Sequence, residues 1–171
     1  MQPHYFIAIP VADEALKDFA ETLLLDRHYK TVYELEEYHL TLRFLGALAA
    51  EEHTAWRQRL EAITQHVSPF TLQLDHLERF GSVERPRVFA AGPRYEEKLF
   101  QLAHQLNPES SKPFVPHVTL AKKWNPEVTY LPPEHMPAVA VPVKEIVLYR
   151  IYPAERPRYQ ADARFQLRKK Q

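Results

Sequence analysis

The chain contains no cysteine, only three glycines and no excess of charge of either sign. Without cysteine there is no thiol nucleophile, no disulfide, and no cysteine-ligated zinc or iron–sulfur centre. Three glycines, with no GxGxxG or P-loop sequence, leave little capacity for a backbone cradle around a nucleotide phosphate. The sequence therefore argues against an ATP-dependent ligase, and any phosphate is expected to be bound by side chains.

Charge and hydropathy exclude two further classes of protein. The 22 basic residues balance 22 acidic ones, so a polyanion would have to be met by a local patch rather than by bulk charge. No apolar run has the length of a membrane span, and the start "MQPHYFIAIPVADEALK" lacks a basic segment followed by a long apolar stretch. We expect no membrane contact, no obligate protein partner and a cytoplasmic location.

Hydrophobic periodicity predicts an α+β fold in which strands pair mainly antiparallel. Apolar residues spaced by three and four predict helices at about 14–24, 50–67 and 95–106. Alternation predicts strands at 4–11, 30–36, 38–46, 70–80, 85–92, 113–123, 143–153 and 159–167, with a proline-rich connection over 126–142. No break in composition marks a boundary, so residues 1–171 are predicted to form one domain.

Two of the predicted strands carry the same short motif, "HLTL" at 39–42 and "HVTL" at 117–120, with an offset of 78 between positions 39 and 117. Residues i and i+2 of a strand project from one face, so His39 lies beside Thr41, and His117 beside Thr119. The intervening leucines and valine point into a core and hold the backbone in place. Nearly half the chain separates the motifs, which favours an internal duplication.

Two imidazoles and two hydroxyls together can transfer protons and bind a phosphate group. Histidine titrates closest to neutrality, so one imidazole can accept a proton while the other donates one. Hydroxyl groups donate hydrogen bonds to phosphate oxygens. The set therefore predicts phosphodiester chemistry without a metal ion or other cofactor, in which one histidine activates water and the other protonates the leaving sugar oxygen. The remaining histidines show no compact metal-ligand spacing.

The paired motifs, together with "HLTLRFLG", "RPRVFAAG" and "FVPHVTLAK", resemble the two-histidine phosphoesterases, and especially the bacterial and archaeal RNA 2′,3′-cyclic phosphodiesterases, also called 2′-5′ RNA ligases. The resemblance runs over essentially the whole chain. It implies two lobes related by a pseudo-twofold, each a small antiparallel sheet with outer helices, and a central cleft carrying both motifs. It also implies a substrate, RNA or nucleotide ends bearing a 2′,3′-cyclic phosphate, and assigns proton donation to His39 and proton acceptance to His117. From the residues alone that orientation stays open.

Several further residues are candidates for phosphate or RNA binding. Arg43 follows Thr41 by two positions, so a regular strand places it on the motif face. Lys122 stands where the family commonly has an arginine; a regular strand would turn it away from Thr119 and bring Lys123 to that face instead. Weaker candidates for contacts with RNA are Arg85, Arg87, Tyr149, Arg150 and Tyr152.

Two alternatives to hydrolysis remain compatible with the sequence. The motifs could hold RNA ends or nucleotides without turnover. The same acid–base pair could also run the reaction in reverse and join RNA ends through a 2′-5′ bond. Analysis of the products formed from a cyclic-phosphate dinucleotide separates turnover from simple binding.

Overall fold

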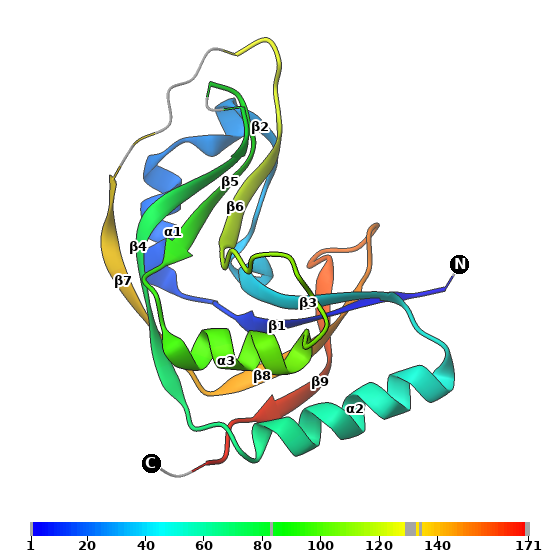
Figure 1. Cartoon of the computed structure of the whole chain (residues 1–171). Coiled ribbons are helices and arrows are strands. Elements are labelled where there is room, and N and C mark those ends of the chain that lie inside the picture. Colours follow the sequence, from blue (N-terminus) through cyan, green and yellow to red (C-terminus); the bar gives the residue numbers. More distant parts are fainter. Residues whose placement is uncertain (1, 83, 129–132, 134, 170–171) are drawn as a thin grey trace.

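The computed structural model describes residues 2–82, 84–128, 133 and 135–169, and within them the chain forms three α-helices and nine strands (Figure 1). The helices are α1 (Glu14–Thr22), α2 (Ala50–Thr64) and α3 (Glu97–Leu106), and two 3₁₀ turns are η1 (Leu25–Arg27) and η2 (Leu35–Glu37). The strands are β1 (His4–Pro10), β2 (Tyr29–Val32), β3 (His39–Ala47), β4 (Phe70–Gly81), β5 (Pro86–Pro93), β6 (Val118–Trp124), β7 (His135–Val143), β8 (Glu145–Ile151) and β9 (Tyr159–Gln166).

All strand pairs are antiparallel, and the strands follow the order β7-β4-β5-β6-β3-β1-β8-β9, with β2 pairing to β6. The predicted α+β fold is therefore confirmed. At the centre of the sheet, β3 and β6 share a single residue pair, Leu40 with Val118. Two groups of strands thus meet at one point, where each contributes its motif strand. That residues 1–171 form one domain stays a prediction.

One face of the sheet is covered by the helices, whose apolar stripes enter the same large core. Leu16 of α1, Leu60 of α2 and Leu99 of α3 are each fully buried there. The Asp13 carboxylate accepts a hydrogen bond of 3.0 Å from the Leu16 amide and so caps α1. The helix ends at Thr22, earlier than predicted, because Leu24 takes a left-handed backbone conformation with φ of 52°.

The proline-rich connection predicted over 126–142 is partly wrong, since His135–Val143 form β7. Pro137 and Pro142 both lie in this strand, although prolines ordinarily indicate an irregular segment. Within the described part of the chain, β7 lies at one end of the strand order and pairs with β4 alone, so a residue without an amide proton can occupy its unpaired side. The other predicted strands match, except that residues 33–36 leave β2 and residues 113–117 precede β6. Among the described residues, no helix is both long and apolar enough to cross a membrane.

Candidate active site

The two motifs lie side by side on the face of the sheet opposite the helices. Leu40 and Val118 are direct partners in the antiparallel pair, and neither is exposed to solvent. Their neighbours point the other way, and the antiparallel register sets His39 opposite Thr119 and Thr41 opposite His117. The two histidines are diagonal neighbours, a relation that places residues about 7–8 Å apart in antiparallel sheets. We call these four half-buried side chains the motif quartet.

The register also explains the offset between the motifs. Leu40 and Val118 occupy equivalent motif positions, and they are the pair that joins β3 to β6. A local twofold axis passing between them therefore exchanges His39 with His117 and Thr41 with Thr119. Each histidine consequently faces the hydroxyl of the other motif. A group bound on the axis would therefore have one histidine and one threonine on each side of it.

Both histidines are held by the same backbone contact. The Nδ1 atom of His39 lies 2.6 Å from the carbonyl oxygen of Glu37, and that of His117 lies 2.9 Å from the carbonyl oxygen of Val115. A carbonyl oxygen only accepts, so Nδ1 carries the proton in each ring. This leaves Nε2 as the nitrogen that exchanges a proton with a ligand.

Aromatic rings back the two imidazoles. Phe6 contacts His39 with ring centroids 4.8 Å apart, and Phe80 contacts His117 at 4.6 Å. His39 is enclosed further by Tyr159, whose ring meets it edge-on at 5.0 Å, and by Tyr33 and Tyr149. Burial among these rings, together with the nearby charges of His117 and Lys122, lowers the pKa of His39 to about 4, although the hydrogen bond to the Glu37 carbonyl opposes the shift. The ligand-free ring is therefore neutral at pH 7.

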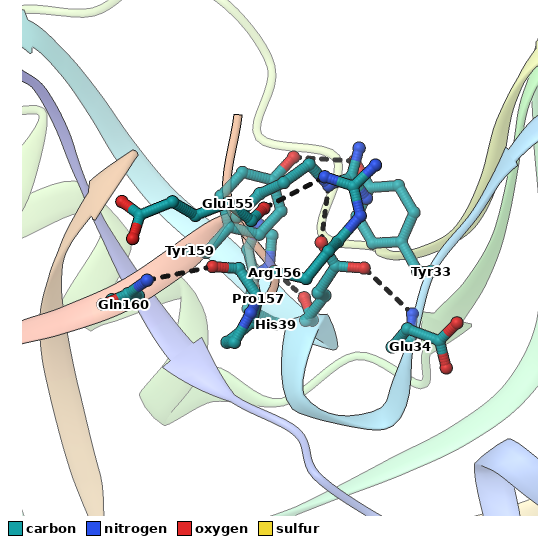
Figure 2. Close-up of polar contacts among 10 residues, drawn as sticks. Tyr33, Glu34, His39, Glu155, Arg156, Pro157, Tyr159 and Gln160 are labelled. Carbon is teal, nitrogen blue, oxygen red and sulfur yellow. Dashed lines mark hydrogen bonds and ion pairs between the residues drawn. The ribbon is translucent and has the colours of Figure 1, made fainter. Parts of the chain in front are cut away.

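A buried ion pair supports the His39 side of the site. Glu37, 2% exposed, accepts a hydrogen bond of 2.5 Å from the Arg158 Nε. It accepts another from the amide of Glu34, which is labelled at one end of a dashed line in Figure 2. Burial alone would raise the pKa of Glu37, but these hydrogen bonds hold it below its ordinary value. The Arg158 guanidinium also lies over the rings of Tyr33 and Tyr159, whose hydroxyls are 3.1 Å apart. Sequence reasoning missed this pair because 121 positions separate its members.

The placement predicted for Arg43 is wrong, and a β-bulge is the reason. Opposite β1, Thr41 pairs with Ala8 and Arg43 pairs with Ile7, so Leu42 is an extra residue on β3. Because Ile7 belongs to the helix-side core, Arg43 turns to that side. Its Nη1 donates to the carbonyl of Leu106 at 2.7 Å, and its guanidinium lies over Trp56 at 5.0 Å.

A matching bulge in β6 has the opposite consequence for Lys122. Thr119 pairs with Ala90 and Ala121 with Phe89, so Leu120 is the extra residue and Lys122 returns to the motif face. Its Nζ lies 5.6 Å from the centre of the Tyr33 ring, and its charge acts on His39. The expectation from a regular strand, that Lys123 rather than Lys122 would share this face, is wrong.

The weaker candidates fall into two groups. Tyr149 packs in the site wall, stacked on Phe6 at 5.1 Å, while Arg150 lies over the ring of Tyr152 at 4.9 Å. Arg85 and Arg87 are exposed near the tip of the β4–β5 hairpin. Among the described residues, no three histidine, aspartate or glutamate side chains gather as a metal site would require.

Comparisons with known proteins agree with this geometry. A family profile described as "LigT like Phosphoesterase" matches residues 8–90. A protein of Archaeoglobus fulgidus named RNA 2′,3′-cyclic phosphodiesterase is 31% identical over 135 residues, which cover 72% of this chain and 75% of that protein. The chain belongs to the LigT-like phosphoesterase family.

Two further relatives of this family carry the same name. A Bacillus subtilis protein is 28% identical over 182 residues, covering 98% of both chains. A Geobacillus stearothermophilus protein is 32% identical over 179 residues, which make up 96% of this chain but only 57% of that protein.

Solved structures show the same fold along the whole chain. The Thermus thermophilus protein TT0787 superposes with a TM-score of 0.82 at 25% identity, covering 98% of this chain and 100% of that one. Escherichia coli LigT, solved with 3′-AMP, gives a TM-score of 0.77 at 27% identity, covering 99% and 100%. The family predicted from the paired motifs is therefore confirmed.

Proposed function

We propose that this protein is an RNA 2′,3′-cyclic phosphodiesterase that opens cyclic phosphate ends to 2′-phosphates without a metal ion. The observation that carries the proposal is the Leu40–Val118 pair, because its register brings two imidazoles and two hydroxyls to one spot. The names of the relatives, and the nucleotide bound to the E. coli protein, support the same substrate class.

In the proposed reaction the Thr41 and Thr119 hydroxyls donate to the non-bridging phosphate oxygens. One histidine takes a proton from water through Nε2 as the water oxygen attacks phosphorus. The bond from phosphorus to O3′ breaks, and the other histidine gives its Nε2 proton to O3′. One water is consumed and a 2′-phosphate and a 3′-hydroxyl are formed. Following the family resemblance, we assign donation to His39 and acceptance to His117.

This assignment demands a change in the charge of His39. Its pKa of about 4 leaves the ring neutral at pH 7 before substrate arrives. A phosphate anion beside the ring favours the charged form and opposes the effect of burial. His39 therefore takes up its proton together with the substrate, and the aromatic rings packed around it strengthen its attraction to the phosphate by lowering the local polarity.

The deciding experiment is incubation with a dinucleotide that ends in a 2′,3′-cyclic phosphate, with and without EDTA, followed by identification of the products. We expect a 2′-phosphate at the same rate in both reactions. An unchanged substrate that nevertheless binds would identify a non-catalytic binder, and dependence on a divalent metal would contradict the proposed chemistry. Addition of an RNA bearing a free 5′-hydroxyl tests whether that hydroxyl can replace water as the nucleophile and join the two RNA ends through a 2′-5′ bond.

The neighbouring lysines of β6 offer a matched test of phosphate binding. The bulge sets Lys122 on the motif face, whereas Lys123 is exposed, with φ of 65°. Lys122→Met is expected to lower kcat/KM for the cyclic-phosphate substrate about tenfold, because a cation near the phosphate is removed. Lys123→Met should leave it within about twofold. Equal losses in the two variants would show that bulk charge, not the position of Lys122, matters.

A further inference from the structure

A cavity lies along β3 beyond Thr41, where β3 and β6 part. Beyond Leu40, β3 runs antiparallel to the segment that precedes His117, and the two no longer pair. Between them lies a pocket of about 660 Å³, lined by Arg43, Phe44 and Arg59 on one side and by residues 107–110 and Lys112 on the other. The connection from α3 to β6 crosses β3 in Figure 1, and Asn107 at its start donates a hydrogen bond of 3.0 Å to the carbonyl of Leu42.

The pocket is cationic, although the chain as a whole has zero net charge. Arg43, Arg59 and Lys112 line it, against one carboxylate, Glu109. Such an excess of positive charge in a concave surface attracts an anion.

Each of the two arginines has a structural contact, which among the described residues leaves most of its N–H donors without a partner. Arg43 donates to the carbonyl of Leu106 and Arg59 to that of Gln105, at 2.7 and 2.8 Å, and both guanidinium groups lie over Trp56. These contacts cap the end of α3. A guanidinium has five N–H donors, so each arginine retains capacity for phosphate oxygens while its plane is held by the indole.

An exposed aromatic ring, that of Phe44, lines the pocket three residues beyond Thr41 of the quartet. Phe44 pairs with Phe6, so the bulge that turns Arg43 away returns Phe44 to the motif face. Its side chain is 61% exposed and also lines the pocket. A large apolar ring left in water beside a phosphate site is suited to stacking with a nucleobase.

We propose that this pocket binds the RNA chain that precedes the cyclic phosphate, with a base against Phe44 and a backbone phosphate at Arg59 and Lys112. The inference rests on the proposed function and narrows its substrate, since only an oligonucleotide has the phosphate that fills the pocket. A mononucleotide would contact the quartet but not the pocket.

The test compares two substrates in each variant, adenosine 2′,3′-cyclic phosphate and a short oligoadenylate with the same cyclic end. For Arg59→Met and for Lys112→Met, the ratio of kcat/KM for the oligonucleotide over the mononucleotide is expected to fall about tenfold. The salt dependence of the oligonucleotide reaction should weaken by about 0.7 in its log–log slope for each phosphate that the variant no longer neutralises. Arg57→Met is the control, because Arg57 lies on α2 but does not line the pocket, and its ratio should not change.

The outcomes separate this inference from the function on which it rests. An unchanged ratio in both variants, or a wild-type enzyme that does not prefer the oligonucleotide, would overturn the pocket assignment while leaving cyclic phosphodiesterase activity intact. Failure of the wild type to hydrolyse either substrate would reject the proposed function instead. In that case fluorescence anisotropy with a 3′-phosphorylated oligoadenylate still decides the inference: weaker binding by Lys112→Met but not by Arg57→Met supports it, and equal binding rejects it.

Discussion

Replacing either motif histidine with glutamine is expected to lower kcat for a 2′,3′-cyclic nucleotide by a factor of about 10²–10⁴. The reason is that His39→Gln or His117→Gln removes one of the two proton transfers that the reaction requires. The double variant should lose little more than the worse single one, because the two residues act as a unit. Steady-state kinetics measures the loss, and thermal melting followed by circular dichroism shows that the variants fold.

A matched control is His66→Gln, since His66 is an exposed histidine just beyond α2. It should leave kcat unchanged. Retention of full activity by either motif variant would refute the acid–base assignment.

The roles of the two histidines follow from calorimetry of a nucleoside 2′-phosphate in two buffers that differ in ionisation enthalpy. If His39 is the donor, binding near pH 7 takes up a proton in the wild type and in His117→Gln but not in His39→Gln. Absence of uptake in the wild type would assign His39 as the base.

Removing the carboxylate of Glu37 is expected to destabilise the protein by about 3–5 kcal/mol, because the charge of Arg158 is then left buried without its partner. Glu37→Gln keeps the shape of the side chain while removing its charge, so the loss reports the ion pair rather than a cavity. Urea unfolding at pH 7 measures it. The double variant Glu37→Gln/Arg158→Met should recover part of the loss, since no uncompensated charge remains.

The exposed pair between Arg168 and Glu61, at 3.6 Å, provides the comparison. Its side chains are 57% and 45% exposed, so Glu61→Gln should change the free energy of unfolding by less than about 1 kcal/mol.

The stabilisation by Glu37 also depends on pH. Its folded-state pKa is depressed, so the stabilisation is present above the ordinary carboxyl pKa and is lost as pH falls through the lower value. The gap between wild type and Glu37→Gln should therefore shrink on acidification, and a gap that stays constant would contradict the ion-pair explanation.

Local pattern was sufficient to predict the parts of this structure that obey a regular period. Strand alternation predicted that Leu40, Leu42, Val118 and Leu120 would be buried behind the motifs, and all four are at most 4% exposed. It also predicted the shared face of each histidine and threonine. Strand alternation could not predict that the two motifs meet across the sheet. The signal for that contact was the repetition of the motif.

The incorrect predictions came from features that leave no trace in the alternation of apolar and polar residues. A one-residue bulge reverses every side chain that follows it, and nothing in "TLRF" or "TLAKK" differs from an unbroken strand. Arg43 and Lys122 were therefore each assigned to the wrong face. The Glu37–Arg158 pair depends on tertiary contact alone, and β7 was missed because its prolines are tolerated only through its position at the sheet edge.

Around Leu40 and Val118, each motif histidine faces the threonine of the other motif, and this arrangement bears on how activity depends on protein concentration. Each half of the chain supplies a histidine whose facing hydroxyl comes from the other half, so neither half alone could assemble one complete side of the site. A protein with a single motif would need a second copy to do so, and its activity would vanish on dilution. Because one polypeptide carries both motifs, the site assembles without any cost of association, however scarce the protein is.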